Sequence, residues 1–287
     1  MHKPFLAPLA ALSFTLALTS TAYAQATKVT NADFLGVSLQ TPAADVMSIL
    51  RKNYPKLQLE ITNYTITNAG TALKFNDGYK AQLETHLAPA ERSSVAIAIN
   101  NFRANALPDG SIIGLQREIT FNPNQQTLQP LIDGLVAKYG EPTFLDKGNG
   151  QSMVTLLWSD KMVPGQRRKD ANPNGNVGGT PYYKCSTEIA HYAGISYDPS
   201  DLFNGLATTN TRLYVNAQAA KECGTILLAS LVPASGNGAY ANTMTLQLAN
   251  LADAPERVRK QSQDFTARVQ AATAQKQQSD AKNVPKF

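Results

Sequence analysis

Residues 122–142, NPNQQTLQPLIDGLVAKYGEP, indicate the fold class because they contain a complete amphipathic helix with its start and stop signals. Asn122 is a suitable N-cap, and Gln125 stands where a capping-box side chain reaches back to it. Gly140 and Pro142 end the helix. One buried helix face is predicted by the spacing of Leu128, Leu131, Ile132, Leu135 and Tyr139.

An earlier part of the chain has a similar layout. Thr41 is a good N-cap for a helix that Pro55 ends. Alternating apolar residues then predict strands, with an Asp-Gly turn signal at Asp77-Gly78 between two of them. Arg117 interrupts the last apolar set, so it faces the wrong way or lies at a sheet edge. The three apolar sets are Leu57, Leu59 and Ile61; Val95, Ile97 and Ile99; and Ile113, Leu115, Ile119 and Phe121.

Further strands are expected after the second helix, so the fold class is α+β: antiparallel sheets with a few helices packed on one face. The helix-plus-sheet pattern occurs twice, which predicts two related blocks. The expected later strands are Met153–Trp158, near Lys184–Ile189, Arg212–Val215, Thr225–Val232 and Thr243–Leu251.

The first 24 residues have the layout of a cleavable export signal. Lys3 precedes an apolar run over residues 5–18, and Ala22-Tyr23-Ala24 forms a cleavage site. A membrane anchor is the alternative, but the run is too short for about 30 Å of hydrocarbon. We expect cleavage after Ala24, a periplasmic protein, and no transmembrane segment in the mature chain.

The predicted organisation is therefore a signal peptide over 1–24, a first α+β block over 25–121, a second block with a disulfide over 122–252, and a C-terminal helix with a frayed tail over 253–287. The fraying is expected from Gln277 onward. Asp253 and Glu256 are spaced as a capping box at the start of that helix. Its sparse apolar stripe is expected to dock the first turns and consists of Val258, Phe265, Val269 and Ala272.

The two cysteines, Cys185 and Cys223, form an even pair that predicts a disulfide in an oxidising compartment. A redox or metal pair is the weaker alternative, since the spacing is not CxxC. The formal net charge is +5 without a run of five like charges, so no nucleic-acid partner is expected.

Motifs for catalysis and for metal binding are incomplete. No G-x-S-x-G sequence occurs, and beyond the signal the histidines are His86 and His191, of which His191 is the better candidate for a catalytic site. Asp170 begins half of a calcium loop, but Pro181 stands where the loop needs a bidentate Glu. We therefore predict no catalytic residues, no metal site and no cofactor.

Arg167, Arg168 and Lys169 are the candidate binding residues, because they gather three cations in a Gly-, Asn- and Pro-rich stretch. They suit an anionic partner such as lipid headgroups or an acidic protein surface. The alternative is a solvated loop that keeps the protein in solution. The sequence does not indicate an oligomeric state.

The pattern Lys138-Tyr139-Gly140-x-Pro142, then Trp158, Cys185 and Cys223-Gly224, resembles a group of uncharacterised exported proteobacterial proteins over roughly residues 115–260. The resemblance implies periplasmic residence and a Cys185–Cys223 disulfide, and it brings no activity. The helix-on-sheet blocks are also similar in style to envelope modules of the outer-membrane-assembly lipoprotein and lactamase-inhibitor kind, which bind proteins.

These observations favour a periplasmic protein without catalytic activity that binds a protein or a cell-envelope component. One alternative is an envelope hydrolase with an unrecognised site around His191. The other is a carrier of a small ligand or lipid with a cavity between the sheet and the helices.

Overall fold

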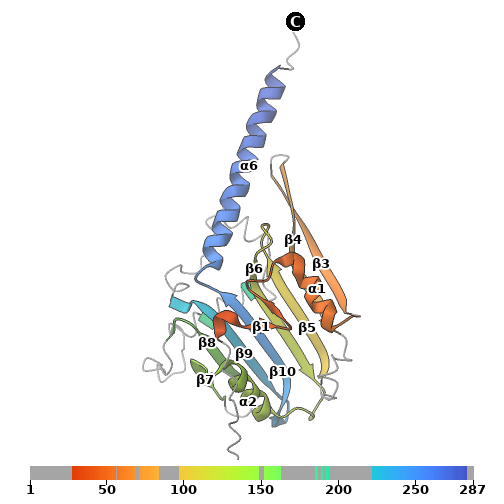
Figure 1. Cartoon of the computed structure of the whole chain (residues 1–287), viewed down its shortest axis with the longest axis vertical. Coiled ribbons are helices and arrows are strands. Elements are labelled where there is room, and N and C mark those ends of the chain that lie inside the picture. Colours follow the sequence, from red (N-terminus) through yellow and green to blue (C-terminus); the bar gives the residue numbers. More distant parts are fainter. Residues whose placement is uncertain are drawn as a thin grey trace, which may run out of the picture.

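The fold is an eight-stranded antiparallel sheet with helices, which confirms the predicted α+β class (Figure 1). The computed structural model describes residues 28–55, 57–68, 71–83, 97–148, 152–162, 185–186, 189, 192–193 and 222–282. The strand order is β3-β4-β5-β6-β10-β9-β8-β7. The strands are β3 (Gln58–Asn68), β4 (Thr71–Leu83), β5 (Ile97–Ala106), β6 (Ile112–Phe121), β7 (Phe144–Asp146), β8 (Val154–Ser159), β9 (Thr225–Ala234) and β10 (Asn237–Asn250).

Each half of the sheet is a helix followed by four strands. Helix α1 (Ala43–Asn53) precedes β3 to β6, and helix α2 (Leu128–Tyr139) precedes β7 to β10. The last strand of each half lies at the centre, where β6 pairs with β10 and Ile119 faces Met244. The two blocks therefore form one continuous sheet, and the strand order is symmetric about its centre.

Helices α1 and α2 cover the same face of this sheet, which we call the helix face (Figure 1). Val46 and Leu50 of α1 and Ile132 and Leu135 of α2 are buried in one core with residues of both sheet halves. A short hairpin, β1 (Asp33–Phe34) and β2 (Val37–Ser38), contributes Phe34 to that core. The hairpin turn has positive φ at Leu35 and Gly36, as a tight two-residue turn requires.

A second core lies at one end of the opposite face, between the sheet and the long helix α6 (Ala254–Lys282). Val258, Phe265 and Val269 are buried there, so the predicted docking stripe of this helix is confirmed at those positions. The helix continues to Lys282, past Gln277 where the frayed tail was expected, and projects well beyond the sheet (Figure 1).

The predicted start of α2 at Asn122 is wrong, because the helix begins at Leu128 with Thr127 as its N-cap. Asn124 has a positive φ, and the backbone N–H of Ala241 donates to the Gln126 carbonyl at 2.7 Å. This contact holds residues 126–127 against β10, so the chain turns there instead of continuing a helix.

The Asp-Gly signal at Asp77-Gly78 does not mark a turn between strands. β4 runs through it, with an irregularity in the pairing at that point, and β3 and β4 pair up to Asn68 and Thr71. A Cβ on Gly78 would lie 2.8 Å from the Ala104 carbonyl oxygen, so the glycine permits a close approach of β5.

The strand expected near Lys184–Ile189 is also wrong where the structure describes it, since the described residues there are helical. The buried positions are Cys185, Ile189, Tyr192 and Ala193. Their spacing of i, i+4, i+7 and i+8 is that of one helix face, a signal that was present in the sequence.

Candidate binding surface

The face of the sheet opposite α1 and α2 carries a band of polar side chains, and we call it the open face. On this face, one row of directly paired residues crosses the whole sheet and has a polar residue on each of the eight strands. We call it the polar row. Its members in order across the sheet are Gln58, Gln82, Asn101, Glu118, Thr245, Ser230, Thr155 and Asp146. Because strand side chains alternate between faces, the same strands still supply apolar residues to the core behind.

A second row, next to the first, carries opposite charges close together. Glu60 of β3 faces Lys80 of β4, Lys80 faces Arg103 of β5, and Arg103 faces Gln116 of β6. Glu60 and Lys80 are exposed, whereas Gln116 is buried. The sheet is hollowed over these four strands, and the hollow has a volume of about 490 Å³.

Lys80 and Arg103 are two cations directly opposite each other, an arrangement that is unfavourable in a sheet by itself. Both line the hollow, together with Glu60 and Glu118. The surface therefore offers two cations side by side, together with two acidic groups.

An apolar rim borders the polar row on its other side. Ile99 faces Thr120, Thr120 faces Thr243, and Thr243 faces Val232. Ile99 and Val232 are each 40% exposed, and Met153, directly before β8, is 48% exposed. Polar and exposed apolar groups thus lie side by side on the open face.

The other end of this face is covered by the second core. Asn105 of β5 donates from Nδ2 to the carbonyl of Tyr192 at 2.7 Å. A Cβ on Gly114 of β6 would lie 2.0 Å from the same carbonyl oxygen, so the backbone around Tyr192 lies directly on the strand. In the part of the chain that the structure describes, the open area therefore lies at the end that carries the hollow and the apolar rim.

The helix face has a different character. Arg117 lies on central strand β6 and donates from Nε to Oδ1 of the fully buried Asn100 at 3.1 Å. Arg117 shares its face of the sheet with Leu115 and Ile119, and β6 lies between β5 and β10. Of the two alternatives stated for Arg117, the sheet edge is therefore wrong. Burial raises the pKa of Tyr139 above its ordinary value, and its hydroxyl donates to the Asp33 carbonyl at 3.4 Å.

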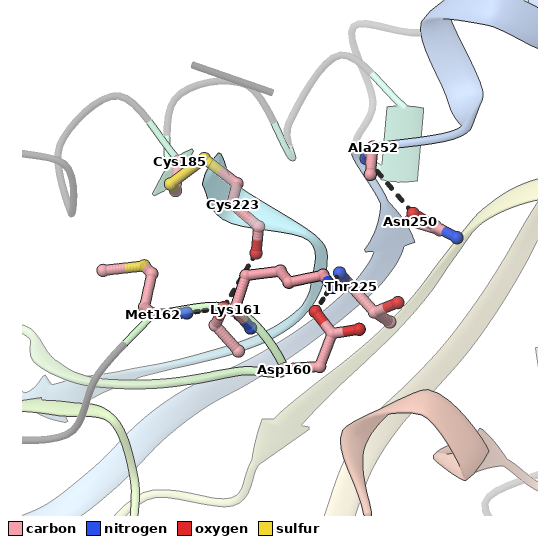
Figure 2. Close-up of a disulfide and its surroundings, with 9 residues drawn as sticks. Asp160, Lys161, Met162, Cys185, Cys223, Thr225, Asn250 and Ala252 are labelled. Atoms are coloured by element: carbon pink, nitrogen blue, oxygen red, sulfur yellow. Dashed lines mark hydrogen bonds between the residues drawn. A yellow bond between two sulfur atoms is a disulfide. The ribbon is translucent and has the colours of Figure 1, made fainter. Parts of the chain in front are cut away.

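The predicted disulfide between Cys185 and Cys223 is confirmed (Figure 2). Both cysteines are buried, with Cα atoms 5.7 Å apart. Ser159 Oγ donates to the Cys223 carbonyl at 2.8 Å, and Asp160 Oδ1 accepts from the Thr225 backbone N–H at 2.8 Å. The end of β8 therefore fixes the turn that carries Cys223, a role that neither Ser159 nor Asp160 revealed in the sequence.

The other residues of the K-Y-G-x-P and Trp pattern also have structural roles. Trp158 donates from Nε1 to the Gly140 carbonyl at 2.8 Å. The rings of Trp158 and Tyr139 have centroids 5.7 Å apart, and Nζ of Lys138 lies 5.0 Å from the Tyr139 ring centroid. The pattern joins the end of α2 to β8 and forms no separate site.

The predicted binding residues Arg167, Arg168 and Lys169 lie outside the described residues, as do His86, His191 and the loop that begins at Asp170. In the ranges that are described, no group of three or more His, Cys, Asp or Glu side chains is placed to hold a metal ion. None of the described helices combines the length and the apolar character needed to cross a membrane.

Comparison of the chain with family models, with curated proteins and with solved structures gives no match. The functional argument therefore rests on the open face itself.

Proposed function

We propose that this chain is a non-catalytic protein of the periplasm that binds a partner protein through the open face of its sheet. The observation that carries the proposal is the combination of the polar row with the hollow around Lys80 and Arg103. These side chains stand on four neighbouring strands that are hydrogen-bonded to one another, so the surface needs less ordering on binding than a loop would.

The chemistry of the surface suits a protein more than a small ligand. The hollow is wide and lined by amide and charged side chains, whereas small-molecule sites are mostly apolar and enclosed. Protein interfaces combine polar groups with apolar anchors and are enriched in Arg and Met. Here Arg103 is the arginine, and the exposed side chains of the apolar rim, Ile99, Val232 and Met153, are the apolar anchors.

The paired cations define the chemistry of the partner. A carboxylate of the partner placed over Lys80 and Arg103 would add to the opposite charge that Glu60 and Glu118 supply in the hollow. Arg103 can bind a carboxylate in a bidentate manner, which fixes its orientation. The partner is therefore expected to present an acidic group, flanked by polar groups that meet Gln58, Gln82 and Asn101.

The periplasmic location rests on two observations. The Cys185–Cys223 disulfide requires an oxidising compartment to form and persist. The first 24 residues have the pattern of an export signal. The Arg167–Lys169 segment stays a predicted contribution to binding because it gathers three cations in the sequence.

Charge reversal tests this proposal. The Lys80→Glu/Arg103→Glu variant should capture at least about tenfold less of the specific partner from the cell envelope than the wild type, a loss of about 1.4 kcal/mol or more. The matched control is Arg51→Glu/Lys52→Glu, which makes the same change in net charge at exposed positions of α1. Capture is quantified by mass spectrometry after crosslinking, with an Arg167→Ala/Arg168→Ala/Lys169→Ala variant in parallel. Equal capture by the wild type and the Lys80/Arg103 variant would refute the role of the open face.

A further inference from the structure

The two edges of the sheet differ in a way that points to a second interaction surface. One edge is β7, which has 3 residues, follows Pro142 and is followed by Lys147 and Gly148. The other edge is β3, which has 11 residues and is the outermost strand beside β4 (Figure 1). No described strand other than β4 pairs with it.

The irregularity in the β3–β4 pairing at Thr62 and Asn63 places its extra residue on β4, and β3 itself carries few of the features that protect an edge strand from pairing. Natural edges are short, or carry Lys, Pro or inward charges, because an unpaired row of backbone N–H and C=O groups is a template for another strand. β7 meets this description. β3 contains no Pro, Lys or Arg, and its one charged residue is Glu60. Ile61 in the same strand is 38% exposed.

We propose that β3 pairs antiparallel with β3 of a second copy of this chain, with Asn63 on the two-fold axis. Asn63 is the middle residue of the strand, so this register lets the full length of each strand face the other. Ile61 of one copy then faces Thr65 of the other on the same side of the sheet, and both residues are exposed in the single chain. Cross-strand pairs of β-branched residues stabilise such an arrangement.

Charge also favours self-pairing in this register. Glu60 of one copy faces residue 66 of the other and not the second Glu60, so no like charges meet. The contact is isologous and closes after two copies, which avoids an open-ended fibre. Antiparallel edge pairing places the same face of both sheets on one side, so the two open faces become neighbours in one larger surface. The inference concerns β3 alone and does not depend on the proposed function.

A charge-swap experiment tests the pairing. Wild-type mature protein should form a dimer in analytical ultracentrifugation across a concentration series. Ile61→Lys/Thr65→Lys places Lys opposite Lys, and Ile61→Glu/Thr65→Glu places Glu opposite Glu, so each variant alone should dimerise at least about tenfold more weakly. An equimolar mixture of the two variants should recover the dimer. The control Gln263→Lys/Gln270→Lys adds the same charge at exposed positions of α6 and should stay dimeric.

A single-cysteine probe tests the register. Residues directly opposite in an antiparallel pair have Cα atoms about 4.5–5.5 Å apart, within reach of a disulfide. Asn63→Cys should therefore form a covalent dimer under mild oxidation. In Thr65→Cys the two new thiols would lie about 14 Å apart and should stay unlinked. Both native cysteines are already paired, so the added thiol reports alone. A monomeric wild type at every concentration, or equal crosslinking of the two variants, would overturn the proposal.

Discussion

Gly114 shows how one residue can determine which part of the open face stays open. It stands on β6, where any side chain would collide with the backbone carbonyl of Tyr192, and Asn105 binds the same carbonyl from β5. In the sequence Gly114 is only a glycine inside an alternating strand. Its role depends on a segment far along the chain, so periodicity could not reveal it.

Gly114→Ala should therefore lower the free energy of unfolding by about 1–3 kcal/mol, because the added methyl group displaces backbone. The control is Gly134→Ala on the exposed side of α2, where a Cβ meets nothing within 4 Å. That change should raise stability by about 0.5–1 kcal/mol, since alanine favours the helix. Urea unfolding followed by circular dichroism measures both variants. A Gly114→Ala protein as stable as the wild type would mean that the Tyr192 segment does not pack on β6.

Among the secondary-structure elements, those with a strong local period were predictable. The apolar faces of α1, α2 and the first turns of α6 follow from their spacing, as do most strands. The first residue of α2 was not predictable, because it depends on the backbone hydrogen bond between Ala241 and Gln126, which are far apart in the sequence. Cys185, Ile189, Tyr192 and Ala193 have a helix period in the sequence, so the helical character of the described residues there was also predictable.

The Cys185–Cys223 bond is the element-scale feature with the largest expected effect on stability. It spans a sequence separation of 38 and fastens the segment that covers the second core. In the chain-entropy description a loop of this length stabilises the folded state by about 4 kcal/mol. Cys185→Ala/Cys223→Ala should therefore unfold at a markedly lower urea concentration than the oxidised wild type.

The control for this prediction measures free thiols, to establish that the bond is present in the exported protein. A thiol assay on denatured, unreduced protein from the envelope should find no free thiol, and reduction should release both. Two free thiols in the exported protein would contradict the disulfide and the oxidising compartment together. A double variant as stable as the wild type would show that the bond does not fasten the second core.

At the scale of the whole molecule, the strands of the two halves meet in one sheet whose two faces carry different side chains. The helix face holds the main core, and the open face presents the polar row, the hollow and the apolar rim. Glu60, Lys80, Arg103 and Glu118 come together only once the register of four strands is known. Sequence reasoning therefore recovered the fold class and the disulfide, but it placed the candidate binding residues on the Arg167–Lys169 segment and missed this surface.

The central claim is that the open face, and not the helix face, contacts the partner. Site-specific photo-crosslinking in intact cells measures this directly, with a photoreactive residue at Gln82 on the open face or at Ala44 on the exposed side of α1. We predict a specific crosslinked protein from position 82 and none from position 44. The same crosslinked protein from position 44, with none from position 82, would contradict the account.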